Sequence, residues 1–450
     1  MSRRLRVLIA SLAVALCAVL AIRPADATTI QRVVSPGGIE AWLVHEPSLP
    51  LVAMNFAFVG GASEDPADKP GVGYMVASLL DEGAGELDSK AFQRRLEDTA
   101  TEMRFSATQD YFYGSIRMLS EHRDQAFDLL RLALQHPRFD DEAVARIRGQ
   151  ILSGLRREST DPGSIATRTW WRDAFPNHPY GRPVNGSLTS VPTIGLADLK
   201  DYTGRVLARR HLKVAAVGDI DAATLGTVLD RVFGALPADG KLAAIPDRTP
   251  QGGGKRVVVS LDVPQSVVRM GGVGVQRNDP GFISAYIVNH ILGGGSFTSR
   301  LYQEVREKRG LVYGVSSYLL TMRHAALFMV TTQAGNDHAG DAVQLIDAQV
   351  RRMADEGPSE AELSKAKAYL KGAYVLNLDT SSKIASVLLQ NQLDNLGIDY
   401  IERRRAMIDA VTVDDARRAA KRLAPGGLLT TVVGRPKGMT VGMTTEAPRP

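Results

Sequence analysis

Cysteine is almost absent from this 450-residue chain, whose single example is Cys17. An intramolecular disulfide is therefore excluded, and thiolate ligation of a metal beyond residue 17 is excluded as well. Aromatic residues are also few, at 6%, whereas 44% of all residues are hydrophobic. Stability must come from burial of mainly aliphatic side chains, and the chain is long enough to form more than one core.

A strong charge of one sign is also lacking, because 54 basic residues face 49 acidic ones and the formal net charge is +5. This balance gives no indication of nucleic-acid binding. None of the 8 histidines is spaced as His-x-x-x-His or His-x-x-Glu-His, and no Gly-x-Ser-x-Gly elbow is present. These patterns therefore predict neither a zinc-binding helix with paired histidines nor the nucleophile of a serine hydrolase.

One long hydrophobic run occurs, from Val7 to Ile22, after an arginine-rich start and before Ala25-Asp26-Ala27. This pattern predicts a secretory signal peptide over residues 1–27, cleaved after Ala27. The run is shorter than the roughly 20 residues that a bilayer core requires, which argues against a membrane anchor. Leu16 before Cys17 is too bulky for a lipoprotein site. We expect an exported chain with no membrane attachment after cleavage, periplasmic if the source is a two-membrane bacterium.

The rest of the chain repeats the same order of elements at a near-constant offset, far longer than any solenoid unit. Each half is predicted to contain a strand, a turn and a helix, and to close with a helix and a strand. The matching segments are 51–58 and 267–275, 64–70 and 278–280, 73–80 and 282–292, 196–206 and 413–423, and 212–218 and 428–434. No Rossmann glycine fingerprint occurs, so we predict an α+β fold of two homologous domains, each with helices on a mainly antiparallel sheet. The alternative is a chance similarity of two unrelated domains.

The boundary between the two halves is predicted from composition. Residues 238–255 contain Pro246, Pro250 and three consecutive glycines with little apolar periodicity, as in a flexible connector. The domains are then expected over 28–237 and 256–437. Residues 438–450 show no periodicity and are expected to be a disordered tail.

The segment Pro70-Gly-Val-Gly-Tyr-Met-Val-Ala-Ser78 resembles the helix that carries the inverted zinc motif, H-x-x-E-H, of the insulinase (pitrilysin) family of metallopeptidases. In that family two histidines bind zinc and the glutamate activates the zinc-bound water. The matching positions here are Tyr74, Ala77 and Ser78, and the position of the third, carboxylate ligand aligns with Gly154. None of these side chains can do that work, so the resemblance implies no metal site in this chain.

Two further strings carry the resemblance. Residues 175–184, Phe-Pro-Asn-His-Pro-Tyr-Gly-Arg-Pro-Val, resemble a loop of many family members, so His178 is interpreted as a loop residue and not as a ligand. Residues 292–314 contain a triple glycine followed by Arg306 and Tyr313. The triple glycine has no Gly-Lys-Ser/Thr ending, which argues against a phosphate loop.

In the family, the residues that match Arg306 and Tyr313 hold the substrate peptide. Guanidinium and phenol groups can donate to a peptide carbonyl oxygen, which gains negative charge during hydrolysis. We expect Gly310 to end the helix that carries Arg306, so that Tyr313 begins a strand. The alternative is that Arg306 pairs with Glu304 or Glu307 and Tyr313 is a core aromatic.

The resemblance implies the zinc-less, non-catalytic subunit of an exported two-chain metallopeptidase, which also resembles the subunits of the mitochondrial processing peptidase. Its partner would be a zinc-bearing homologue, its ligand a peptide, and the pair would close like a clam. Arg306 and Tyr313 would contribute to substrate binding. Two alternatives remain open: a purely structural subunit, as in mitochondrial respiratory complexes, and a peptide-binding module that acts alone without hydrolysis.

Overall fold

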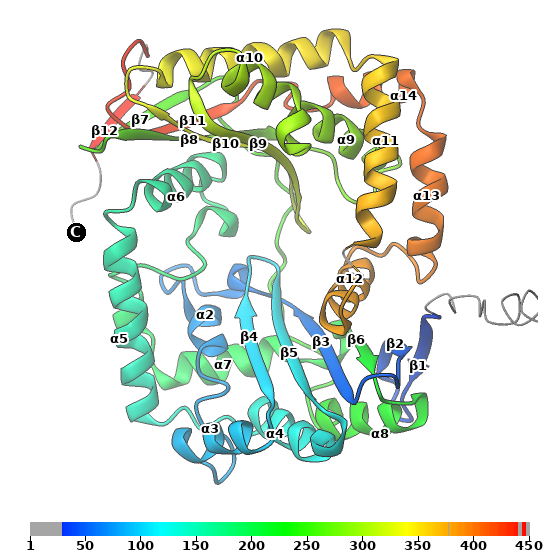
Figure 1. Cartoon of the computed structure of the whole chain (residues 1–450). Helices are drawn as coiled ribbons and strands as arrows, with labels where there is room; N and C mark the ends of the chain where they lie inside the picture. Colours follow the sequence, from blue (N-terminus) through cyan, green and yellow to red (C-terminus); the bar gives the residue numbers. More distant parts are fainter. Residues whose placement is uncertain (1–28, 377, 440–442, 447–450) are drawn as a thin grey trace, which may run out of the picture.

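The computed structural model describes residues 29–376, 378–439 and 443–446, which form two six-stranded sheets and the helices that pack on them (Figure 1). The predicted signal peptide, residues 1–27, lies outside the described residues. Across the described part of the chain, no helix combines the length and the apolar character that a membrane crossing requires.

The first sheet has the strand order β1-β2-β6-β3-β5-β4. Its strands are β1 (Gln31–Val34), β2 (Glu40–His45), β3 (Leu51–Val59), β4 (Glu102–Ala107), β5 (Tyr111–Leu119) and β6 (Lys213–Gly218). Neighbouring strands are antiparallel, except that β2 and β6 are parallel.

The second sheet has the order β12-β7-β11-β8-β10-β9. Its strands are β7 (Arg256–Ser260), β8 (Gln265–Val273), β9 (Val312–Thr321), β10 (Ala326–Gly335), β11 (Leu429–Gly434) and β12 (Met443–Glu446). From β7 to β9 it repeats the pairing of the first sheet from β2 to β4, with one parallel and three antiparallel contacts. The α+β class and the duplication are therefore confirmed.

The duplication extends to single glycines. Gly218 and Gly434 end equivalent strands, β6 and β11, with φ angles of 134° and 149°. A Cβ atom on Gly218 would lie 2.0 Å from the carbonyl oxygen of Leu51, and one on Gly434 would lie 2.5 Å from the hydroxyl of Ser266. Both positions need glycine because the chain turns there with a positive φ against the neighbouring strand.

The edge strands β1 and β12 differ in direction between the two sheets, and β12 contradicts part of the prediction for the C-terminal residues. β1 runs antiparallel to β2, whereas β12 runs parallel to β7. β12 lies within residues 438–450, which were expected to form a disordered tail. The expectation was wrong for these four residues because the open edge of β7 supplies hydrogen-bonding partners that sequence periodicity does not reveal.

Most helices cover the outer face of a sheet, as the two large cores show, and amphipathic patterns are the main reason that they form there. The first half contains α2 (Val72–Ala77), α3 (Ser89–Asp98), α4 (Arg123–Gln135), α5 (Asp141–Glu158), α6 (Pro162–Ala174), α7 (Leu196–Val206) and α8 (Ala222–Phe233). The second half contains α9 (Phe282–Asn289), α10 (Ala339–Glu356), α11 (Glu360–Val375), α12 (Ser381–Leu393), α13 (Tyr400–Ala410) and α14 (Val413–Lys421). Side chains such as Asp161, Ser359 and Thr412 accept a hydrogen bond from the first turn of their helices.

The two halves exchange one helix each, as Figure 1 shows. Helix α6 of the first half packs on the second sheet, where the indole of Trp170 donates to the carbonyl oxygen of Leu429 at 3.0 Å. Helix α12 of the second half packs on the first sheet, where the amide of Gln392 donates to the carbonyl oxygen of Val214 at 2.8 Å. We call the sheet faces that carry α6 and α12 the inner faces.

The connector over 238–255 contains no helix or strand among its residues, all of which are described. It is nevertheless tied to both halves by hydrogen bonds. Ala243 donates to Glu64 at 2.9 Å, Arg248 donates to the carbonyl oxygen of His324 at 2.7 Å, and Gln251 donates to that of Ala174 at 2.8 Å.

Candidate functional site

Helix α2 carries the positions that match the zinc motif, and buried hydrogen bonds fix its start. Gly71 precedes it with a φ of 105°, and the Asp65 carboxylate accepts from the amides of Gly71 at 2.7 Å and Gly73 at 2.8 Å. Burial raises the pKa of Asp65 to about 7. A Cβ on Gly73 would lie 2.6 Å from the hydroxyl of Tyr202, so the close packing of this short helix requires glycine there.

The side chains of this frame do not fit a zinc ion. Tyr74 is 38% exposed, Ala77 is buried with no donor atom, and the hydroxyl of Ser78 donates to the carbonyl oxygen of Tyr74 at 3.0 Å. Gly154 lies on α5, where a Cβ would meet one atom within 4 Å, a guanidinium nitrogen of Arg157 at 3.9 Å. Zinc hydrolases need three protein ligands and an open position. Within the part of the chain that the structure describes, no group of three His, Cys, Asp or Glu side chains could hold a metal ion.

Arg306 and Tyr313 lie together at the start of β9. The guanidinium of Arg306 stands 5.4 Å from the ring centre of Tyr313 and 4.8 Å from that of Tyr302, within the range of cation–π attraction. Gly310 has a φ of 61° after the π-helical segment Tyr302–Glu307, and β9 begins at Val312. The prediction that Gly310 ends the helix and that Tyr313 begins a strand is confirmed.

The alternative interpretation of this pair is half correct. Arg306 does form an ion pair with Glu307, at 3.0 Å. Glu304 instead pairs with Lys308 at 2.6 Å and Arg309 at 2.7 Å. Tyr313 is no core aromatic, because 87% of it is exposed. The phenol of Tyr313 is therefore accessible to a ligand. Arg306 can also bind a ligand if its guanidinium leaves the partly exposed carboxylate of Glu307.

Two aromatic side chains that the sequence interpretation missed complete this surface. Tyr302 stacks beneath Arg306, and Phe297, 69% exposed, meets the ring of Tyr302 edge-on at 5.0 Å. The available signal was the spacing of Tyr302 and Arg306 by four residues, which places them on one side of a helical segment.

The triple glycine that precedes this surface is required by packing. Residues His290–Gly294 form a π-helical turn. A Cβ on Gly293 would lie 2.5 Å from the hydroxyl of Ser317, and one on Gly295 would lie 2.7 Å from the carbonyl oxygen of His290. The glycines let this turn pack closely against β9, which supports the interpretation that they form no phosphate loop.

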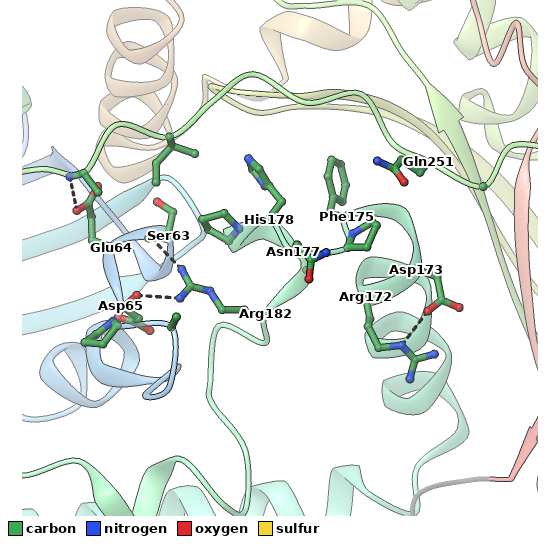
Figure 2. A pocket seen from close by; sticks show the side chains of 18 of the residues that line it. Ser63, Glu64, Asp65, Arg172, Asp173, Phe175, Asn177, His178, Arg182 and Gln251 are labelled. Atoms are coloured by element: carbon green, nitrogen blue, oxygen red, sulfur yellow. Dashed lines mark hydrogen bonds and ion pairs between the residues drawn. The ribbon is translucent and has the colours of Figure 1, made fainter.

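The loop over 175–184 lines a cavity of about 1260 Å³ together with residues 63–67 and the connector (Figure 2). The Nε2 atom of His178 lies 3.0 Å from the carbonyl oxygen of Pro246, its Nδ1 accepts from the amide of Tyr180 at 3.2 Å, and burial lowers the pKa of its imidazole. With both nitrogens used, His178 ties the loop to the connector, which agrees with its interpretation as a loop residue. Arg182 donates to the carbonyl oxygens of Asp65 at 3.0 Å and Ser63 at 3.2 Å.

A buried network joins the same loop to the second half. The hydroxyl of Tyr180 donates to the carboxylate of Asp110 and accepts from the amide of His324 at 3.1 Å. Asp110 also accepts from the amide of Arg323 at 2.9 Å. Burial, with the neighbouring carboxylate, raises the pKa of Tyr180 well above its usual value. The loop is thus a structural joint between the halves.

Comparison with known proteins agrees with this geometry. Residues 42–187 match the family model described as Insulinase (Peptidase family M16), and residues 193–370 match the model described as Peptidase M16 inactive domain. An uncharacterized zinc protease of Streptomyces coelicolor is 27% identical over 406 residues, which cover 87% of each chain. A protein of Helicobacter pylori named Non-peptidase homolog YmxG is 26% identical over 74% of this chain and 77% of its own.

Solved structures give the same assignment. A peptidase M16 inactive domain from Pseudomonas fluorescens aligns with a TM-score of 0.85 and 27% identity, covering 93% of this chain and 100% of that chain. The periplasmic protease PqqL of Escherichia coli shares the fold, with a TM-score of 0.77 and 15% identity, but the alignment covers 91% of this chain and only 46% of that one. Because the two models of one family together match most of the chain, the chain belongs to the insulinase family, peptidase family M16.

Proposed function

We propose that this chain is the non-catalytic, zinc-less subunit of an exported two-chain zinc metallopeptidase, and that it supplies Arg306 and Tyr313 to bind the peptide substrate. The observation that carries the proposal is a contrast between its halves. The first half keeps the frame of the zinc helix without a donor set, whereas the second half presents a stacked guanidinium and an exposed phenol. Arg306 and Tyr313 would donate to a substrate carbonyl oxygen as it gains negative charge.

Comparison with PqqL supports a partner. The alignment uses 91% of this chain but only 46% of PqqL, so that periplasmic protease has further residues beyond the part that matches this chain. No group of three metal-holding side chains occurs in the described residues of this chain, so a catalytic zinc would need ligands from elsewhere. We therefore expect a zinc-bearing homologue as the partner, with the zinc in that subunit and none in this one.

Export is proposed from the predicted signal peptide over residues 1–27. PqqL is described as periplasmic, in agreement with an exported member of this fold. A periplasmic location follows if the source is a two-membrane bacterium.

The first test measures peptidase activity and zinc content of the mature chain, alone and mixed with a zinc-motif homologue from the same genome. We expect no stoichiometric zinc and no activity in the lone chain, and hydrolysis of peptides by the mixture. Stoichiometric zinc with hydrolysis by the lone chain would refute the proposal. A stable mixture that never cleaves peptides would favour the purely structural alternative.

Variants separate the roles of the two side chains within the mixture. Arg306→Gln should reduce kcat/KM by about 10²–10³-fold, the usual cost of removing a donor to an oxyanion. Tyr313→Phe retains the ring that Arg306 stacks on and removes only the hydroxyl. The matched control is Arg309→Gln, three positions away, whose guanidinium is bound to Glu304. Equal activities of Arg306→Gln and Arg309→Gln would contradict a role in substrate binding.

A further inference from the structure

A smaller cavity of about 440 Å³ opens at the first turn of α6, on the inner face of the second sheet. It is formed by α6, by the end of α5, by the loop over 181–185 and by one side chain of β8. Among its lining residues are Ser164, Arg168, Trp171, Arg182, Asn185 and Arg269. Three arginines therefore line one small cavity. Arg168 pairs with Glu158 and Arg182 donates to two carbonyl oxygens, whereas the side chain of Arg269 of β8 donates to one carbonyl oxygen only.

Strand register places Arg269 in a polar row. It lies directly opposite Thr431 of β11 and Thr331 of β10, and Thr331 lies opposite Ser316 of β9. Residues opposite one another in antiparallel strands point to the same face, so the four side chains cross the inner face together. Thr331 and Ser316 are hydrogen-bonded at 3.2 Å, while the buried hydroxyl of Thr431 has no partner within the described part of the chain.

Arg269 has no counter-charge at contact distance. Its one hydrogen bond goes to the carbonyl oxygen of Val268, at 3.2 Å, and no carboxylate of the described residues forms an ion pair with it. Its guanidinium lies beside the first turn of α6, 3.9 Å from where a Cβ on Gly163 would be. Burial lowers the pKa of Arg269, and the nearby charge of Asp161 opposes this shift only through space, so the hydration that the guanidinium loses is only partly replaced.

The two carboxylates that line the cavity are already used. Asp161 caps α6 by accepting from the amide of Ser164 at 2.7 Å. Glu158 accepts from the side-chain amide of Asn185 at 2.9 and 3.0 Å and pairs with Arg168 at 3.3 Å. Asp161 attracts Arg269 at longer range but forms no ion pair with it, so the N–H groups of the guanidinium remain open to an anion from outside the chain.

We propose that this cavity binds one carboxylate group of an extended peptide, with Arg269 as its principal donor. A guanidinium offers two parallel N–H groups that match the two oxygens of a carboxylate. The lining carries three arginines and two carboxylates, an excess of one positive charge that matches one negative charge, and a cavity of this size admits a peptide end or side chain but no folded protein. The proposal rests on the proposed function only in taking a peptide as the ligand.

The test measures fluorescence anisotropy of labelled peptides with the mature chain alone, at low salt. The probes are an Ala-Ser hexapeptide with a free C-terminal carboxylate, its C-terminal amide, and that amide with one internal glutamate. We expect the free acid to bind about tenfold or more tightly than the amide, as a charge-assisted hydrogen bond provides. If the internal glutamate restores binding, the subsite also accepts an acidic side chain; if it does not, the C-terminus is selected.

Two variants assign the effect to Arg269. Arg269→Gln should abolish the preference for the acid over the amide, and Arg269→Lys, which keeps the charge but loses the planar fork, should reduce it. The control is Arg323→Gln, because Arg323 is exposed, lines another cavity and forms no ion pair within the described residues. Equal affinities of acid and amide for the unmodified chain, or an unchanged preference in Arg269→Gln, would overturn the proposal.

Thermal unfolding without peptide distinguishes a binding arginine from a structural one. An arginine kept for a ligand destabilises the free chain, so Arg269→Met should raise the unfolding midpoint. A lower midpoint would mean that Arg269 stabilises the fold, and would count against the subsite. Because these measurements use the chain alone, they can fail while the mixture with the zinc-bearing homologue still hydrolyses peptides, and the two proposals are refuted separately.

Discussion

Replacing Gly271 by alanine tests the exchange of helices between the two halves. Gly271 lies in β8, directly beneath α6, and an added Cβ would stand 2.4 Å from both the sulfur of Met329 and the indole ring of Trp170. Trp170 is fully buried and hydrogen-bonded to β11, so it cannot move aside without breaking that bond. Overpacking of this kind costs about 1–3 kcal/mol of unfolding free energy.

The matched control is Gly314→Ala in β9 of the same sheet. An added Cβ there meets no atom within 4 Å, and its φ is not positive. Such a change stabilises a protein by about 0.4–1 kcal/mol, because it restricts the unfolded chain. The free energies of unfolding of the two variants should therefore differ by about 1.5–4 kcal/mol, because Gly271→Ala lowers this free energy and Gly314→Ala raises it.

Urea unfolding followed by tryptophan fluorescence measures both variants. Gly271→Ala should lower the midpoint and shift the tryptophan emission of the folded state, to which Trp170 contributes together with Trp42 and Trp171, whereas Gly314→Ala should raise the midpoint slightly with unchanged emission. Gly271→Ala with the stability and emission of Gly314→Ala would show that α6 does not pack on the second sheet. The assignment of α6 to the inner face would then be wrong.

Three further variants test other parts of the fold. The guanidinium of Arg300 binds Glu362 at 2.7 Å and lowers the pKa of its carboxyl group to about 2. The stability that this ion pair contributes should be complete above about pH 4.5 and should be lost as the pH falls towards 2. Unfolding measured as a function of pH should show no such loss in the Glu362→Gln variant. Gln392→Met removes the hydrogen bond from α12 to β6 and should lower the free energy of unfolding by about 1 kcal/mol, which urea titration measures. Gly114→Ala would place a Cβ 2.0 Å from the ring of Phe56 in the first core, and should reduce the thermal midpoint more than Gln392→Met does.

The positions of several helices and strands were predicted from the sequence to within a residue or two. The helix predicted over 196–206 is α7 (Leu196–Val206), and the strand predicted over 51–58 is β3 (Leu51–Val59). Both patterns are local, since alternation and helical spacing record which side chains are buried. The helix predicted over 282–292 continues beyond α9 as a π-helical turn, because the glycines there let the chain pack against β9 in a way that periodicity does not encode.

The positions of the candidate site could also be predicted from the sequence, because individual residue types indicate them. Tyr74, Ala77 and Ser78 predict a zinc-motif helix without ligands by residue type alone, and Gly310 identifies the helix end before Tyr313. The ring of Tyr302 beneath Arg306 could have been inferred from spacing, but the exposure of Tyr313 could not, because a tyrosine near a strand start is equally compatible with a core position.

The sequence by itself determined the family and the duplicated α+β order, because each depends on residue identity or on short-range pattern. Only the tertiary structure decided which sheet each helix covers, since an amphipathic face shows that a helix is buried and not against what. Trp170 bonds to Leu429 and Gln392 to Val214 across the two halves, and no local signal joins such distant residues. The surroundings of Arg269 depend in the same way on strand register and on the packing of α6, which place it in a row of hydroxyl groups, near Asp161 but without an ion pair among the described residues.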